Sequence, residues 1–134
     1  MIHTDIDIKD ELWRWVSESS LASLVTGGVY KDQRPLNSEL EDIIIAVIAR
    51  TADAQMQEAT ANINIYVADK RRGKEAIEDT VRLRTLCTEA ASLFEYRHTG
   101  DAIYELDSQE VMKVYGADWH VINNRIRISY KNEL

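Results

Sequence analysis

The chain has 134 residues and a formal net charge of −7. This length predicts one domain spanning residues 1–134, and the single cysteine excludes an intrachain disulfide, which suits a reducing cytoplasm. The acidic balance disfavours nonspecific binding to nucleic acid or to an anionic membrane, because such binding requires a basic surface. The longest apolar run is too short for a membrane span, and the acidic first residues do not predict a secretory signal.

The first predicted element is a helix over residues 5–18. Thr4 can cap this helix, and the early acidic residues suit the positive end of the helix dipole. Trp13 lies off the apolar stripe, either as a partly covered surface side chain or as an anchor for a protein partner. Residues 21–25 either continue the helix or begin a second turn. The buried stripe is predicted from four apolar residues at helical spacing: Ile8, Leu12, Trp15 and Val16.

Extended segments follow this helix. Residues 29–31 begin the first one after a Thr-Gly-Gly break, and residues 32–38 have the composition of a loop. The β-branched run within residues 38–50 predicts a long buried strand, and the polar residues 51–58 predict the loop of a hairpin. Residues 59–68 alternate between apolar and polar side chains, which predicts a strand with one buried face. That face should contain Ala61, Ile63, Ile65 and Val67.

The pattern then changes to the helical period. A charged turn is predicted at residues 69–73 and a long helix over residues 74–97. Residues 102–115 fit either a broken strand or, in their second half, a short helix. Even spacing of apolar residues predicts a last strand over residues 120–131. The apolar stripe of the long helix should consist of Ile77, Val81, Leu83, Leu86, Cys87, Ala90, Leu93 and Phe94.

These elements predict an α+β fold with the order α-β-β-β-α-β-β. Strands that are neighbours in sequence usually pair. We therefore expect a mostly antiparallel sheet of about five strands with two helices packed on one face.

No catalytic motif stands out in the sequence, and an enzyme is not expected. The three histidines, His3, His98 and His120, show no metal-ligand spacing. The remaining catalytic possibility is an acid–base pair of Glu105 with His120. The basic run at residues 70–72 fits a solvated turn, and it also fits a contact for an acidic partner or for a nucleic-acid backbone.

Long strands in a small domain tend to leave an edge or a projecting hairpin, and such features can pair with a neighbouring subunit. The polar tip at residues 51–58 is the segment from which we expect such an arm. The alternative function is a small-ligand or peptide-binding module with a pocket between the sheet and the long helix. Its lining is expected from Tyr66, Tyr104, Trp119 and Tyr130.

Several short runs resemble tail-terminator or tail-completion proteins of tailed phages and prophages. The expected order of elements is also similar to that of the family, and the resemblance spans most of the chain. The runs are Gly28-Val29-Tyr30, Arg34-Pro35, Ser38, Glu41-Asp42-Ile43, residues 61–67 and residues 119–126.

The resemblance implies a structural role without catalytic residues or a cofactor. Proteins of this family form a ring, commonly a hexamer, that caps the tail tube and then meets head-completion proteins. It implies a location in the bacterial cytoplasm during assembly and at the head–tail junction of the virion. Neither a membrane nor direct contact with nucleic acid is expected. Loop positions suggest four partner-contact residues: Gln33, Arg34, Met56 and Arg71.

Overall fold

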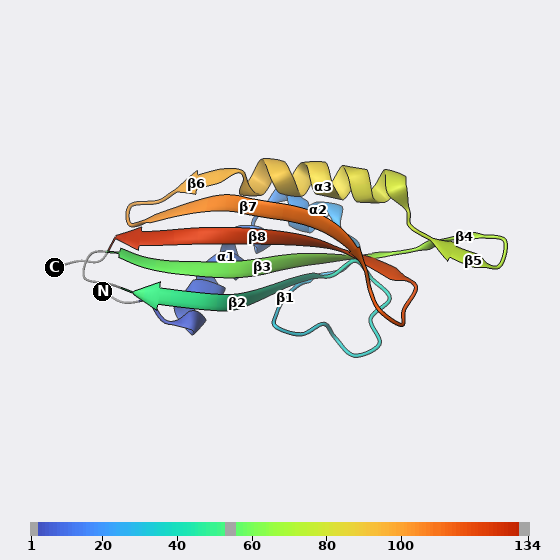
Figure 1. Ribbon diagram of the computed structural model, residues 1–134, viewed down its shortest axis with the longest axis horizontal. Coiled ribbons are helices and arrows are strands. Elements are labelled where there is room, and N and C mark those ends of the chain that lie inside the picture. Colours follow the sequence, from blue (N-terminus) through green and yellow to red (C-terminus); the bar gives the residue numbers. More distant parts are fainter. Residues whose placement is uncertain (1–2, 53–55, 132–134) are drawn as a thin grey trace.

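The computed structural model describes residues 3–52 and 56–131. These residues form an α+β fold in which a six-stranded sheet carries three helices, and a two-stranded hairpin extends from one end (Figure 1). The strand order of the large sheet is β1-β2-β3-β8-β7-β6. In chain order the elements are α1 (Asp5–Ser17), α2 (Ser20–Leu24), β1 (Val29–Lys31), β2 (Ile43–Ala52), β3 (Met56–Ala68), β4 (Lys70–Arg72), β5 (Glu75–Ile77), α3 (Thr80–Phe94), β6 (Tyr96–His98), β7 (Ala102–Lys113) and β8 (Trp119–Lys131).

The sheet is mostly antiparallel, as the sequence predicts, but its first strand is not. β1 runs parallel to β2, with Val29 opposite Ile43, whereas the other strand pairs of the described sheet are antiparallel. β3 and β8 pair along their full lengths and form the centre of the sheet. The expectation of about five strands and two helices was too low, because α2, β4, β5 and β6 are too short to show a period in sequence.

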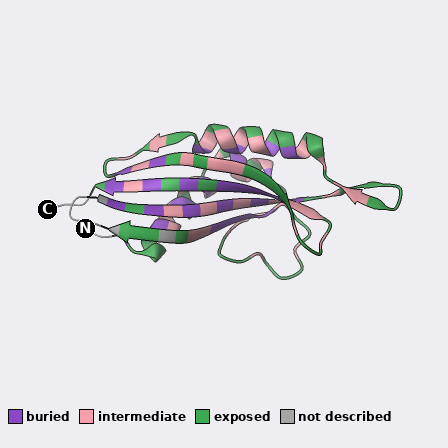
Figure 2. Ribbon diagram, in the orientation of Figure 1, coloured by how far each residue is buried: buried purple, intermediate pink, exposed green. Residues whose placement is uncertain are grey.

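The core lies between one face of the sheet and the helices. Alternate residues of the central strands face it, and Ile63 and Ile126 have no exposed surface. Figure 2 shows this alternation as purple bands along β3 and β8. Burial of one such side chain contributes roughly 1.5–3 kcal/mol. The predicted stripe of α1 is confirmed, with Ile8, Leu12 and Val16 fully buried and Trp15 half-buried against the ring of Phe94.

Capping residues set the start of both longer helices. Thr4 Oγ1 accepts from the backbone N–H of Asp7 at 3.1 Å, and the Asp7 carboxylate accepts from the Thr4 N–H at 3.0 Å. That backbone bond lowers the pKa of the Asp7 carboxyl. Helix α3 begins at Thr80, not at residue 74, because the Asp79 side chain accepts from the N–H of Arg82 at 3.2 Å and caps it there.

Two boundaries predicted from the pattern were wrong, and one alternative left open by the pattern is now decided. The described positions within residues 51–58 are strand and not loop, because the β2–β3 ladder continues to the pairs Thr51↔Glu58 and Ala52↔Gln57. Residues 95–97 do not extend the long helix, because β6 joins the sheet beside β7. The ambiguous residues 102–115 contain a strand and no helix among their described positions. A register shift between Leu106 and Ser108 accounts for its broken pattern.

Arg82 shows why the ends of α3 depend on distant residues. Helical spacing predicts an ion pair with Glu78, but the Arg82 guanidinium instead binds both carboxylate oxygens of Glu41, at 2.6 and 2.8 Å. The same guanidinium donates to the carbonyl of Leu24 at 2.7 Å. The bonds to Glu41 raise the pKa of Arg82. This one side chain therefore joins α3 to α2 and to the segment before β2.

Candidate interaction surface

The element that stands apart from the body is the hairpin β4–β5, residues 70–77, which we call the arm. It extends beyond the end of the large sheet, and its main contacts are between its own two strands (Figure 1). Every residue from Lys70 to Glu75 is exposed, and the arm is green and pink in Figure 2. An isolated two-stranded hairpin is marginally stable in water. An exposed hairpin also presents unpaired strand edges with which another chain can pair.

The turn of the arm depends on a glycine. Gly73 has a φ of 63°, which L-residues with a side chain adopt at a cost, and it begins the two-residue connection between the paired residues Arg72 and Glu75. Arg72 Nη2 also lies 2.8 Å from Glu75 Oε2 across the hairpin. This exposed ion pair contributes little stability, roughly 0–1 kcal/mol.

The base of the arm is held by His120 of β8. His120 Nδ1 lies 2.6 Å from Oδ1 of Asp69, which precedes β4, and Nε2 lies 3.8 Å from Oε2 of Glu78, which follows β5. The Asp69 side chain is almost fully buried, and its second oxygen is 3.6 Å from Nζ of Lys113. The Asp69 N–H donates to the carbonyl of Asp118 at 3.0 Å. The direction of the arm is therefore fixed at its base, although its length is exposed.

The arm has the opposite charge to the rest of the molecule. Residues 70–77 contain four basic residues and one acidic residue, which gives a formal charge of +3. Because the whole chain carries −7, the remaining residues together carry −10. A basic element that projects from an acidic body is complementary to the body of another copy.

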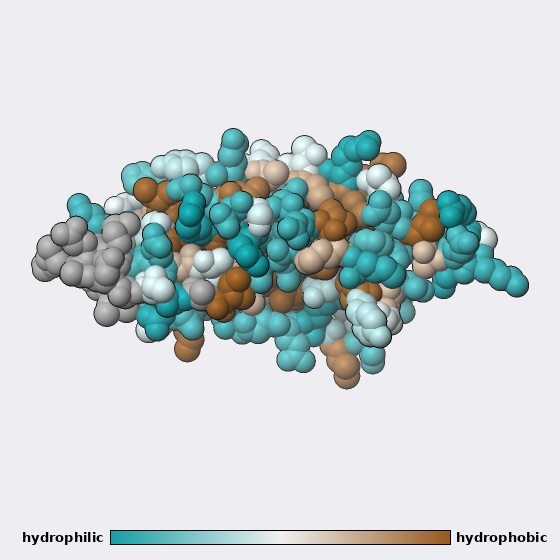
Figure 3. All heavy atoms as spheres, in the orientation of Figure 1, coloured by the Kyte–Doolittle hydropathy of each residue, from teal (hydrophilic) through white to brown (hydrophobic). Residues whose placement is uncertain are grey.

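The sheet face opposite the helices is a second exposed surface. Figure 3 shows this face as largely hydrophilic with scattered hydrophobic patches. Ile48 and Met112 are exposed large apolar residues on it. The edge of β2 is also open, because β1 pairs only with its first three residues while β2 continues to Ala52. A register shift between Val47 and Ala49 and the charge of Arg50 are typical protections of such an edge.

The loop between β1 and β2 closes one end of this face. The Arg34 guanidinium lies 4.5 Å from the ring centroids of both Tyr66 and Trp119, and its Nε donates to Asp42 Oδ2 at 3.1 Å. Asp42 has no exposed surface, and the same oxygen accepts from the Ser38 hydroxyl at 2.5 Å. This network holds the loop onto the sheet.

The structure separates the four residues that were predicted to contact partners. Gln33 is exposed in the β1–β2 loop, whereas Arg34 is engaged within the fold. Arg71 is exposed on the arm, and its Nη2 lies 3.4 Å from Asp118 Oδ2. Met56 begins β3, at the end of that strand away from the arm, and its side chain lies outside the described part of the structure. Of these four residues, only Arg71 lies on the arm.

A hollow lies between α1 and the segment from the end of α3 to the start of β7, and we call it the N-terminal hollow. It consists of two depressions of about 510 and 300 Å³ that share Glu11 and Arg14 in their linings. Trp15 and Tyr104 supply aromatic surface to the larger one. The charged groups of the lining are the carboxylates of Asp7, Asp10, Glu11, Glu18 and Asp101 and the guanidinium groups of Arg14 and Arg97, with His3 beside them.

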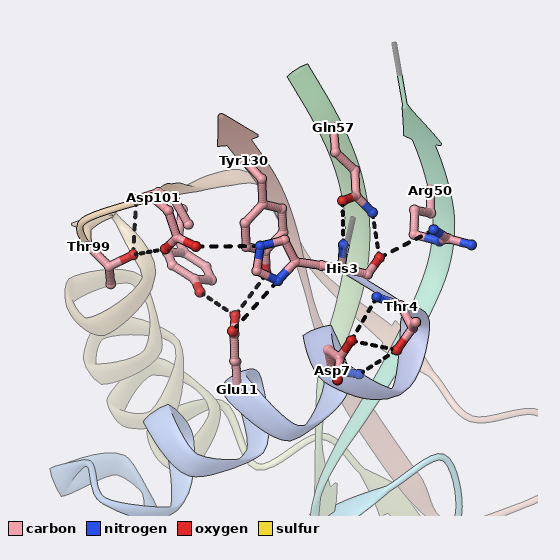
Figure 4. Close-up of polar contacts among 11 residues, drawn as sticks. His3, Thr4, Asp7, Glu11, Arg50, Gln57, Thr99, Asp101 and Tyr130 are labelled. Atoms are coloured by element: carbon pink, nitrogen blue, oxygen red, sulfur yellow. Dashed lines mark hydrogen bonds and ion pairs between the residues drawn. The ribbon is translucent and has the colours of Figure 1, made fainter. Parts of the chain in front are cut away.

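Glu11 is the centre of the polar contacts in this hollow (Figure 4). Its Oε2 accepts from the hydroxyls of Tyr104 at 3.1 Å and Tyr130 at 2.9 Å. The ring of His3 stacks on Tyr130 at 3.9 Å between centroids, and His3 Nε2 lies 3.4 Å from Asp101 Oδ2. Burial raises the pKa of Tyr104 to about 12 and also raises the pKa of Tyr130.

These two tyrosines make the protein sensitive to alkali. Their folded-state pKa values exceed the ordinary value of 10.0, so above that pH the unfolded chain releases their protons first. Their contribution is complete below pH 10.0 and is lost as the pH rises toward about 12. We expect urea midpoints to fall over that range, and two of the six tyrosines to ionise only on unfolding. The double variant Tyr104→Phe and Tyr130→Phe should lose this pH dependence; independent ionisation of all six near pH 10.0 in the folded protein would contradict the assignment.

The acid–base pair considered from the sequence is not present. Glu105 pairs across the ladder with Arg127, and the two side chains are 3.9 Å apart. His120 lies further along β8, opposite Lys113 and beside Asp69. Glu105 and His120 therefore do not share a site.

The prediction that four aromatic residues line one pocket was also wrong. Tyr66 and Trp119 lie on the open face of the sheet, where they enclose Arg34. Tyr104 and Tyr130 are buried on the face covered by helices, where they donate to Glu11. The sheet separates the two pairs.

Comparison of the sequence with models of known protein families and with functionally characterised proteins finds no match. Within residues 3–52 and 56–131, no group of three or more His, Cys, Asp or Glu side chains is placed to hold a metal ion. No helix in the described part of the chain is both long and apolar enough to cross a lipid bilayer. The arm, the open face and the N-terminal hollow are the candidate interaction surfaces of the described residues.

Proposed function

We propose that this chain is the structural subunit of a homo-oligomer in which the arm of each copy binds the next copy. The assembly is a ring like those of phage tail-terminator and tail-completion proteins, which cap a tail tube and meet head-completion proteins. The sequence resemblance to that family supports the phage setting, and the mostly antiparallel α+β sheet is compatible with it.

The observation that carries this proposal is the arm. It is exposed from Lys70 to Glu75, fixed at its base by the contacts of His120 with Asp69 and Glu78, and opposite in charge to the body. A rigidly directed element binds with a smaller loss of conformational entropy than a mobile one. Contact between an arm and a different surface of the next copy is heterologous, and such contacts close into rings when the rotation between copies permits it.

A small-ligand or peptide-binding module is the second candidate, and the N-terminal hollow supports it. Its larger depression, about 510 Å³, lies within the range of small-molecule pockets. Thermal denaturation with a library of small molecules and peptides tests this function. A rise in the melting temperature that depends on Glu11 or Arg97 supports it, whereas a flat response removes it.

The proposed assembly is tested by native mass spectrometry and electron microscopy of the purified chain. We expect one stoichiometry above two and ring-shaped particles in concentrated samples. Because the contacts pair opposite charges, added salt should shift the distribution toward monomer. A chain that stays monomeric at every concentration and salt level contradicts the proposal.

A further inference from the structure

We infer that the surface that receives the arm is the N-terminal hollow of a neighbouring copy. This inference rests on the proposed assembly and names its contact: a basic hairpin tip against a carboxylate-lined depression. The partner is a second copy of this chain.

The two surfaces lie at opposite ends of the molecule. Arg71 of the arm is next to Asp118, which precedes β8, whereas the carbonyl of Asp101 in the hollow accepts from the N–H of Lys131 at the other end of β8. β8 has thirteen residues, and a strand of that length spans about 40 Å. The arm reaches only about 13 Å from its base, at 3.3 Å per residue. An arm therefore cannot occupy the hollow of its own chain.

The charges of the two surfaces are complementary. The exposed cations of the arm are Lys70, Arg71, Arg72 and Lys74. The lining of the hollow has five carboxylates against two guanidinium groups. Like charges elsewhere on the acidic body disfavour other orientations of a second copy, which gives the contact its specificity.

Two of these carboxylates are exposed and accessible to a new cation. Glu18 is exposed and has no ion-pair partner among the described residues, and Asp101 is exposed with His3 as its ion-pair partner. Asp7 and Asp10 are engaged by the Thr4 cap and by Lys31. Glu18 and Asp101 both line the larger depression, so cations of an entering arm meet both carboxylates within one surface.

Nucleic acid is the other polyanion that a basic arm could meet. The remaining residues carry −10, and this charge repels a phosphate backbone while it attracts the arm of another copy. Binding of the arm to a random-sequence DNA duplex in preference to a second copy of the chain would overturn the inference.

The experiment uses one variant for each surface. The arm variant is Arg71→Glu with Arg72→Glu, and the hollow variant is Glu18→Lys with Asp101→Lys. We expect each variant alone to lose at least about 100-fold in self-association, the effect of removing interface hot spots. An equimolar mixture should assemble again with the two variants alternating, because the intact arm of the hollow variant fits the intact hollow of the arm variant and the reversed arm fits the reversed hollow. The chain carrying all four changes should assemble again, because both charges are reversed.

Control substitutions give the same charge change as the hollow variant, at positions away from both surfaces. Glu39→Lys with Glu110→Lys alters two exposed residues that have no ion pairs within the described chain, and assembly should be retained. Circular dichroism checks the fold of each variant. Glu18→Lys alone replaces the hollow variant if the double change unfolds the protein, with a smaller loss of association expected.

The outcomes separate this inference from the proposed function. A hollow variant that assembles like the wild type, while the arm variant does not, overturns the hollow as acceptor and leaves assembly through the arm. A mixture that does not assemble also overturns it. A wild-type chain that is always monomeric overturns both proposals.

Discussion

Asp42→Ala is expected to destabilise the protein by about 3 kcal/mol, the effect of removing one partner of a buried ion pair. Asp42 is fully buried and accepts from the Arg34 guanidinium, the Ser38 hydroxyl and the N–H of Gly28. The backbone at Gly27 lies close to this carboxylate, since a Cβ atom added to Gly27 would lie only 2.2 Å from Asp42 Oδ1. Alanine leaves these donors without an acceptor, which costs free energy in a buried site.

The measurement is urea unfolding of the wild type and the variant. For a domain of this size the melting temperature should also fall by about 10 °C. Glu39→Ala is the matched control, because Glu39 is an exposed carboxylate in the same loop and its loss should cost less than about 0.5 kcal/mol. A double-mutant cycle with Arg34→Met should show coupling, since the two side chains are in contact. A loss below about 1 kcal/mol for Asp42→Ala would show that the network does not hold the loop.

Removal of the arm is expected to abolish self-association and leave the fold intact. The change replaces residues 70–77 with an Asn-Gly turn, which fits because Lys70 and Ile77 are paired neighbours at the base. The main interaction that this deletion takes from the body is the exposed pair of Arg71 with Asp118, so the free energy of unfolding should change by less than about 1 kcal/mol.

A neutral arm separates the effect of charge from that of length. Serine at Lys70, Arg71, Arg72 and Lys74, together with Glu75→Gln, retains the hairpin and removes its charge. We expect association weakened by at least about 100-fold, with thermal denaturation close to the wild type. If the armless chain assembles like the wild type, the arm is not the interface, and the open sheet face becomes the surface to test.

The sequence predicts those parts of the fold in which one local pattern decides the structure. Ile63, Ile65 and Val67 alternate with polar neighbours, and their strand and its buried face are as expected. Leu86 and Ala90 likewise follow the helical period of α3. In these segments the apolar residues predicted by the spacing are the ones that are buried in the fold. Their secondary structure can therefore be predicted without knowledge of the residues that they contact.

The arm and the ends of α3 could not be predicted in this way. Glu75 to Ile77 continue the apolar and charged pattern of the helix, yet they pair with Lys70 to Arg72 across a turn at Gly73. That glycine between two short charged runs was the available signal for a hairpin. The parallel pairing of β1 depends on packing between residues far apart in the chain, and the local spacing of apolar residues carries no information about it.

The polar sites depend on residues that are far apart in the chain. Glu11 meets Tyr104 and Tyr130 only after the last strand is in place, and Arg34 meets Tyr66 and Trp119 across the folded sheet. No spacing rule connects such positions. Their identification therefore requires the structure, whereas the charge of residues 70–72 is evident from the sequence alone.

Sedimentation velocity of the intact and the armless chain, run side by side over a concentration series, tests the central claim most directly. If each copy binds the next through its arm, the intact chain sediments as a multi-subunit species at high concentration and the armless chain remains a monomer. The same sedimentation coefficient for both chains at every concentration contradicts that claim.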